Sequence, residues 1–157
     1  MPKYYKKKYY RSGARDKYSV EQQAGTLDIP IQQQGWVAVV PDTAIQGMRK
    51  VKHLTISIAA DESVSAPGNY SYWALVYVPQ GTTPNTLTLT GQTGMYEPNQ
   101  FVMNCGVADF SGGPLRFTSP VSRNLNSGDR IVLIMTNNTA DTIAHYHYVV
   151  RYAVTLQ

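Results

Sequence analysis

Short runs of apolar and β-branched residues follow one another from about residue 36 to the end of the chain, and some of them alternate apolar with polar positions. Each run is rich in Val, Ile, Thr, Tyr or Trp and is bounded by Gly, Pro, Asn or Asp, which is typical of β-strands and the turns between them. No segment has the periodicity of a long amphipathic helix. The pattern predicts an all-β protein with strands at residues 36–40, 51–58, 70–78, 86–90, 130–136 and 144–156.

Two further segments bring the number of strands to seven or eight. Residues 100–105 fit a strand or a short helix, and residues 115–121 fit an edge strand because they include a proline. This number and spacing of strands predicts a sandwich or a barrel, and a single eight-stranded jelly-roll β-sandwich fits the count. Strict alternation within residues 51–58 places Val51, His53, Thr55 and Ser57 on one side of the strand and Lys52, Leu54, Ile56 and Ile58 on the other.

The N-terminal segment has no such pattern and carries most of the positive charge. Residues 1–17 hold seven Lys or Arg and one acid, a net charge of +6, whereas the remaining residues hold seven bases and nine acids, a net charge of −2. Because the segment lacks Val, Ile, Leu and Phe, it cannot bury enough surface to offset the entropy of ordering, and we expect it to be disordered. The sequence therefore predicts a basic arm, residues 1–24, and a jelly-roll domain, residues 25–157.

The composition of the arm indicates a nucleic-acid partner. Clustered Lys and Arg bind polyanions by releasing condensed counterions, and tyrosine rings stack on unpaired bases. A solubilising tail, or a nuclear-import signal centred on residues 6–8, is the alternative, and an import signal is compatible with binding. The predicted nucleic-acid-binding residues are Lys3, Tyr4, Tyr5, Lys6, Lys7, Lys8, Tyr9, Tyr10, Arg11, Arg15 and Lys17.

The rest of the sequence offers little for catalysis or metal binding. His145 and His147 face the same side of a strand and lie near Asp141, but zinc needs three or four convergent ligands, and only His53 and Cys105 remain as candidates. No motif surrounds Cys105, so we expect a buried, inert thiol. We therefore expect no enzyme activity, no metal and no cofactor. The chain also has no apolar run long enough for a spanning helix and no signal-peptide pattern, so we expect no membrane insertion.

Two segments carry a resemblance to a known family. Residues 122–134 (SRNLNSGDRIVLI) and 148–156 (YVVRYAVTL), with the Lys/Arg/Tyr arm and the all-β domain, resemble the coat proteins of small circular single-stranded DNA viruses that encode a replication initiator, such as circoviruses. The resemblance implies a single jelly roll and assembly of sixty copies into a T=1 icosahedral shell. It also implies packaging of a single-stranded DNA genome by the arm, entry into the nucleus of the host cell through import receptors, and a final location in the virion.

Three other interpretations stay open on the sequence. Satellite-virus coat proteins share the small jelly roll and basic arm but package RNA. A non-structural single-strand-binding module, such as a five-stranded barrel, would need exposed tyrosines on a sheet face, from Tyr70, Tyr72 and Tyr77 or from Tyr146, Tyr148 and Tyr152. A carbohydrate-binding β-sandwich would need Trp36, Trp73 and tyrosines on a common surface.

Overall fold

The computed structural model describes residues 18–62, 64–84, 101–139 and 141–156. The runs predicted as strands that lie within these ranges are strands. The strands predicted at residues 70–78, 130–136 and 144–156 have those bounds, and the described part of the segment predicted at residues 100–105 belongs to a strand that begins at Phe101, not to a helix. The strand predicted at residues 86–90 lies outside the described residues. The strands are β1 (Ser19–Ile29), β2 (Gln34–Val40), β3 (Arg49–Ala60), β4 (Tyr70–Val78), β5 (Phe101–Asp109), β6 (Leu115–Ser119), β7 (Arg123–Leu125), β8 (Arg130–Thr136) and β9 (Ala144–Leu156), with a 3₁₀ turn, η2, at Phe110–Gly112.

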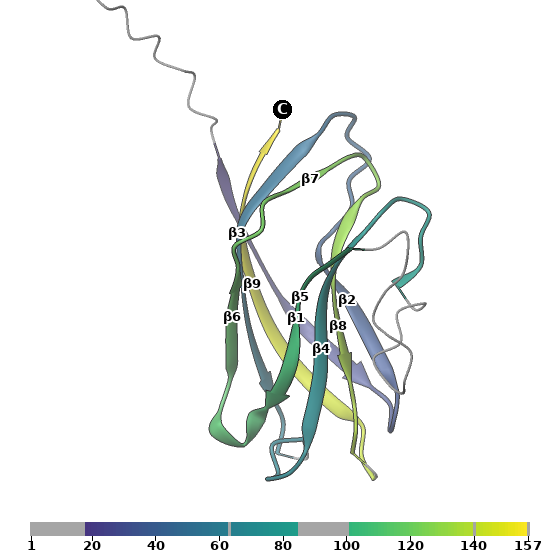
Figure 1. Ribbon diagram of the computed structural model, residues 1–157, viewed down its shortest axis with the longest axis vertical. Coiled ribbons are helices and arrows are strands. Elements are labelled where there is room, and N and C mark those ends of the chain that lie inside the picture. The colour runs from purple at the N-terminus through teal and green to yellow at the C-terminus, as the bar shows by residue number, and fades with distance from the viewer. Residues whose placement is uncertain (1–17, 63, 85–100, 140, 157) are drawn as a thin grey trace, which may run out of the picture.

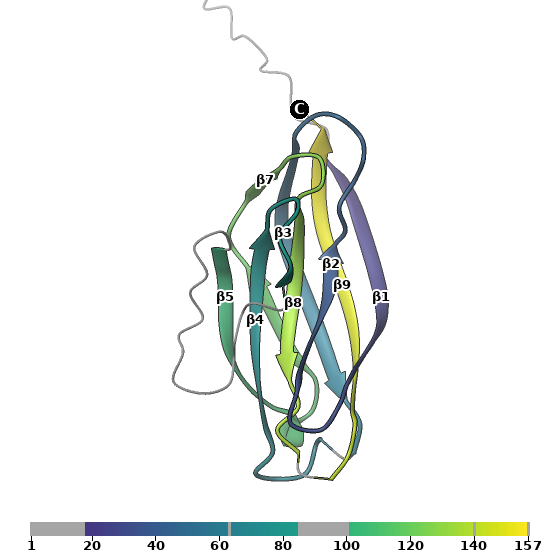
Figure 2. The same ribbon diagram turned by 90° about the vertical axis from the view of Figure 1, so that its right-hand side faces the viewer.

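The strands form two antiparallel sheets that lie face to face (Figure 1). Sheet A has the order β1-β9-β3-β6, with β7 also paired to β3, and sheet B has the order β2-β8-β4-β5. Figure 2 shows sheet B facing the viewer, with sheet A behind it. Because β6 and β7 pair with successive parts of β3, they act as one interrupted edge strand, and each sheet is effectively four-stranded. This strand order, in which the chain passes repeatedly between the sheets, is that of an eight-stranded jelly roll, as the sequence predicts.

The core lies between the sheets and is built from one face of each. On β9 the alternation holds along the strand, with Tyr146, Tyr148, Val150 and Tyr152 buried and the residues between them at least partly exposed. The ring of Trp73 on β4 stacks on Phe117 of β6, with centroids 4.0 Å apart, and so joins the two sheets. Each fully buried large apolar side chain contributes about 1.5–3 kcal/mol to stability, so this core supplies the main driving force for folding.

The two outer faces differ in chemistry. The outer face of sheet B is apolar, and Ala74, Val76, Val78, Val132 and Ile134 form a second, fully buried cluster on it. The charged residues on the strands of sheet B are Arg130 and Asp109, each at a strand end. Every other charged residue within a described strand belongs to sheet A. Among the described strands, charged side chains therefore gather on sheet A.

A β-bulge in β3 corrects the predicted alternation of residues 51–58. The pairing of β3 with β9 shifts between Lys52 and Thr55, and His53 has a φ of 54°. Val51 and Leu54 are both buried, whereas Lys52 is partly exposed and His53 is exposed, so Val51 does not share a side with His53. Positive φ in a residue other than glycine costs of order 1–3 kcal/mol and is retained where the surrounding structure imposes it.

Two other expectations are wrong in part. Residues 19–24, which the sequence assigned to the disordered arm, lie in β1 and pair with β9 from Ser19↔Val154 onward. Cys105, which we expected to be buried, is exposed, because it pairs with Ala74 across β4 and β5 and points away from the core. Within the described ranges there is no helix long and apolar enough to cross a membrane.

Candidate nucleic-acid interface

The predicted nucleic-acid-binding residues all lie in residues 1–17, outside the described part of the chain. What the structure describes is the point where the arm joins the domain. Tyr18 precedes β1 at the end of the sandwich where β9 also ends, because Ser19 pairs with Val154 (Figure 1). The hydroxyl of Ser19 donates a hydrogen bond of 3.3 Å to the carbonyl of Val154, so the first strand is held directly at the root of the arm.

A lysine of the domain lies at this root. The ammonium of Lys52 lies over the ring of Tyr18, 4.8 Å from its centroid, which is a cation–π contact. Lys52 belongs to β3 and pairs with Ala153 of β9, so it extends from the outer face of sheet A. The positive charge that the sequence places in the arm is therefore continued by a basic side chain of the folded domain.

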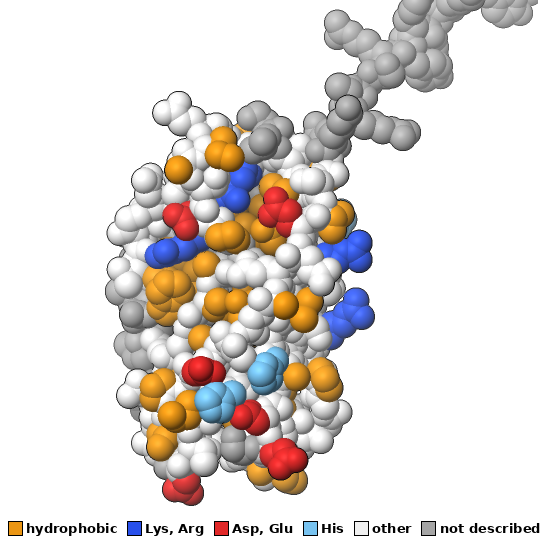
Figure 3. Space-filling view, turned by 180° about the vertical axis from the view of Figure 1, so that it is seen from behind, with side chains coloured by type: hydrophobic (Ala, Val, Ile, Leu, Met, Phe, Trp, Pro, Cys, Tyr) orange, Lys and Arg blue, Asp and Glu red, His pale blue; other side chains and the backbone are white. Residues whose placement is uncertain are grey.

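Further bases lie on the same face. Lys50, Lys52, Arg116 and Arg151 alternate with buried residues along β3, β6 and β9, which places all four on the outer face of sheet A. We call this set the basic face. In Figure 3 the Lys and Arg side chains of the domain lie in the upper half, together with some Asp and Glu side chains, whereas the His side chains lie in the lower half with other Asp and Glu side chains.

The end far from the arm holds an ion pair. Nδ1 of His145 lies 2.7 Å from a carboxylate oxygen of Asp28, and the two residues pair across β9 and β1. The hydrogen bond to Asp28 is the largest effect and raises the pKa of His145 above its ordinary value of 6.5; desolvation opposes it, and the charges of Asp28 and Asp61 add smaller upward effects. His147 faces the same side, as predicted. This end therefore gains positive charge as the pH falls towards the lower values of the neutral range.

Changing Asp28→Asn is expected to lower the pKa of His145 towards 6.5, because the neutral amide cannot stabilise the imidazolium. In the wild type the pKa is raised on folding, so the pair stabilises the fold fully below pH 6.5, and this contribution is lost as pH rises through the folded pKa. Histidine proton shifts followed by NMR against pH measure the change, and His53 is the internal control. An identical His145 titration in both proteins would contradict the assigned hydrogen bond.

The candidates for metal binding and nucleophilic chemistry are not brought together. Over the described ranges, no group of three or more His, Cys, Asp or Glu side chains is arranged to hold a metal ion. Cys105 lies on β5 of sheet B, whereas His53, His145 and His147 lie on β3 and β9 of sheet A. The two sheets therefore separate the thiol from the histidines that could activate it.

The aromatic residues needed by the alternative functions are divided between core and surface. Tyr146 and Tyr152 are buried, and their hydroxyls are used inside the sandwich: Tyr146 bonds Ser71 at 2.6 Å, and Tyr152 donates to Glu21 at 2.6 Å. Tyr70 and Tyr72 are exposed on β4. The two-sheet sandwich is also not a five-stranded barrel, so a base-stacking platform of the barrel type is not formed by β9.

The tryptophans do not form a shared sugar platform. Trp73 is 6 % exposed and stacks on Phe117 in the core. Trp36 lies on the other face of sheet B, half-buried, with the guanidinium of Arg130 5.2 Å from its ring centroid. The two indoles therefore point to opposite faces of the sheet, which removes the surface that a carbohydrate-binding sandwich would need.

The sequence did not indicate the buried contacts of Asp129, a residue of the segment that carries the family resemblance. Asp129 is buried, and its carboxylate accepts hydrogen bonds from the Tyr77 hydroxyl at 2.8 Å and from the backbone N–H groups of Gln80 and Asn126 at 3.1 and 2.8 Å. Burial and the bond to Asp129 raise the pKa of Tyr77 to about 12, so the phenol remains a donor at neutral pH. In the sequence, Ser127-Gly128-Asp129 indicated a turn before the strand at residues 130–136, but it did not indicate the hydrogen-bond partners of Asp129.

Comparison with known proteins identifies no relative of this chain. No family model matches the chain, and no curated protein matches it.

Proposed function

We propose that this chain is a viral coat protein that assembles into a small icosahedral shell of T=1 type and packages a single-stranded DNA genome through residues 1–17. The observation that carries the proposal is the combination of a jelly-roll strand order with a basic, tyrosine-rich segment that joins the domain at one end of the sandwich. Sheets of this kind pack side by side in closed shells, and one inward end with concentrated charge suits a polyanion inside.

The charge is of the size that such a shell requires. Sixty copies of a segment with a net charge of +6 place roughly 360 positive charges inside the particle, enough to neutralise a large share of a small genome. No single segment has to bind tightly, because many linked weak contacts act together. The remainder of the chain, with a net charge of −2, does not compete strongly for the same partner.

The choice of DNA, the sixty-copy assembly, the passage through the host nucleus with import receptors, and the virion as final location extend the proposal by family resemblance. The second candidate function is a non-structural module that binds single-stranded nucleic acid. It is favoured by the exposed Tyr70 and Tyr72, but the buried Tyr146, Tyr148 and Tyr152 count against it.

The test is to express the full chain, purify it under native, nuclease-free conditions and examine it by size exclusion, absorbance at 260 and 280 nm, and negative-stain microscopy. We expect uniform shells with an absorbance ratio that indicates packaged nucleic acid. Nuclease treatment of intact shells should leave the nucleic acid protected. A monomer or small oligomer at every salt concentration and pH tested would overturn the proposal in favour of the binding module.

A further inference from the structure

The β-bulge in β3 places ionisable side chains on the outer face of sheet A. A regular strand would turn Lys52 and His53 to opposite faces, but the bulge leaves both accessible while Val51 and Leu54 enter the core. His53 keeps a left-handed backbone, with a φ of 54°, to achieve this. Bulges recur where a strand must redirect a side chain, so the strained position indicates a use for the surface beside it.

Strand pairing brings the other bases close to Lys52. Arg151 of β9 lies opposite Thr55 of β3, one step along the face from the pair formed by Lys52 and Ala153. Arg116 of β6 lies opposite Ser57 of β3, one step further. Neighbouring strands are about 5 Å apart, and residues on one face of a strand repeat every 7 Å or so, which lets Lys and Arg side chains reach a common chain-like ligand.

Polar groups fill the positions between the bases. Gln22, Arg151, Thr55 and Thr118 form one row across β1, β9, β3 and β6, and the hydroxyls of Thr55 and Thr118 are 3.2 Å apart. Amide and hydroxyl groups of this kind commonly bond phosphate and sugar oxygens. The row is therefore suited to the backbone of a nucleic acid, and the rows on either side of it add the exposed apolar side chains of Val20 and Val149.

Carboxylates do not neutralise this face. The ion pair of His145 and Asp28 lies at the far end of the sheet. The carboxylate of Glu21, on β1, accepts its hydrogen bond from Tyr152 on the core side. Arg116 and Arg151 are exposed, and Lys50 and Lys52 are partly exposed, so the basic face remains open to a polyanion.

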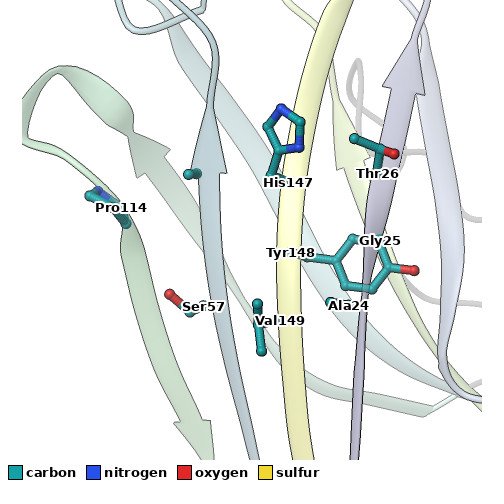
Figure 4. A pocket seen from close by; sticks show the side chains of 9 residues that line it. Ala24, Gly25, Thr26, Ser57, Pro114, His147, Tyr148 and Val149 are labelled. Atoms are coloured by element: carbon teal, nitrogen blue, oxygen red, sulfur yellow. The ribbon is translucent and has the colours of Figure 1, made fainter.

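A shallow hollow of about 540 Å³ lies on the same sheet, and its lining includes Ser57, which pairs with Arg116. It crosses β1, β9 and β3, and most of its lining side chains are small, among them Ala24, Ser57 and Ala59 (Figure 4). Ala24, Val149, Ser57 and Arg116 share one row of the sheet, so the arginine stands at the rim of the hollow. The space can receive a sugar and a base whose phosphates lie on Arg116 and Arg151, and this favours a single strand over a rigid duplex.

We propose that the basic face binds the phosphate backbone of single-stranded nucleic acid and continues, on the folded domain, the site formed by residues 1–17. The proposal rests on the proposed packaging function and adds to it a second binding surface, at Lys50, Lys52, Arg116 and Arg151. Nucleic acid that meets the arm passes Tyr18 and Lys52 and then follows the outer face of sheet A towards the hollow.

The experiment compares full-length variants for binding to a fluorescently labelled, mixed-sequence single-stranded DNA of about 20 nucleotides, titrated at several salt concentrations. The test variant is Lys52→Gln with Arg151→Gln. The matched control is Ala66→Glu with Thr142→Glu, which lowers the net charge by the same two units at exposed positions away from the basic face. Each lost phosphate contact lowers the slope of log K against log salt by about 0.7, so we expect a loss of about 1.4 in the test variant and an affinity roughly tenfold weaker near physiological salt. The control should retain the wild-type slope.

The outcomes separate this inference from the function on which it rests. If wild-type protein shows no salt-dependent binding, the packaging function itself fails. If the wild type binds, and replacing the bases of residues 1–17 abolishes binding while the test variant matches the control, the packaging function stands and the basic face is excluded. A change in self-association of the test variant without nucleic acid, measured by sedimentation, at an unchanged slope would assign the face to contacts between copies and overturn the proposal.

Discussion

Replacing the seven bases of residues 1–17 with glutamine is expected to leave a folded domain that packages little nucleic acid. The substitutions change the net charge of the segment from +6 to −1, which removes the counterion release that drives binding. The buried residues of the described core begin at Leu27, so the sandwich should retain its stability. We expect packaged nucleic acid to fall at least tenfold, measured by the absorbance ratio of purified particles and by extraction and quantification of the nucleic acid.

Two controls separate charge from other properties of the segment. Exchanging its five lysines for arginine keeps the charge and should preserve packaging. Replacing Tyr4, Tyr5, Tyr9 and Tyr10 with alanine removes stacking, at roughly 1–3 kcal/mol for each base contact, but keeps the steep dependence on salt. Packaging at wild-type levels by the glutamine variant would refute the electrostatic account of the arm, even if shells still formed.

Asp129→Ala is expected to cause the largest loss of stability from a single substitution outside the apolar core. The change leaves the Tyr77 hydroxyl and the N–H groups of Gln80 and Asn126 without their acceptor in a buried site. Hydrogen bonds to a charged partner, and the donors left unpaired when it is removed, together predict a cost of about 3–5 kcal/mol. Urea denaturation followed by tryptophan fluorescence measures the change in the free energy of unfolding.

Matched variants make this prediction specific. Asp42→Ala removes an exposed aspartate and should change the free energy of unfolding by less than about 0.5 kcal/mol. Asp129→Asn keeps one acceptor oxygen, so its loss in the free energy of unfolding should lie between those of Asp129→Ala and Asp42→Ala. In Asp129→Asn the pKa of Tyr77 should also fall below its value of about 12, because the amide carries no charge to disfavour the phenolate. Equal unfolding midpoints for Asp129→Ala and Asp42→Ala would show that the three hydrogen bonds do not stabilise the turn.

Asp129 also has a structural role in residues 122–134, the segment that resembles the coat proteins. Its carboxylate joins the turn before β8 to the end of β4, and its carbonyl accepts a hydrogen bond of 3.4 Å from the buried guanidinium of Arg49. Gly128, with a φ of 83°, makes the turn that brings these groups together, and such a backbone suits glycine. The Ser-Gly-Asp pattern therefore organises the loop end of the sandwich nearest the arm, where the proposed partner would enter.

The basic face and the His145–Asp28 pair occupy different parts of the outer face of sheet A. The apolar outer face of sheet B, with Val76 and Ile134 fully buried, has no comparable polar row. Binding along sheet A therefore requires no rearrangement of the core, because every residue that it uses already points outward.

The sequence by itself determined the strands and the separation of charge. Residues 70–78 and 144–156 are strands with the predicted bounds because their aromatic and β-branched composition, and the Pro, Gly and Asp residues near their ends, act locally. The +6 segment is likewise a property of composition, and its predicted binding residues remain a prediction. Local patterns were less reliable for the edge strand of sheet A. Residues 19–24 have few large apolar side chains, but they form a strand because they pair with β9.

Only the tertiary structure decided which residues share a surface. The bulge at His53 arises from the register between β3 and β9, and it reversed the side on which Lys52 was expected relative to Leu54. Cys105 is exposed because its strand presents that side to the outside of sheet B, which no motif around it indicates. Lys52, Arg116 and Arg151 are far apart in the chain, and they become neighbours because β3 pairs with both β6 and β9. Strand order and register depend on contacts between distant segments, so periodicity within one segment cannot determine them.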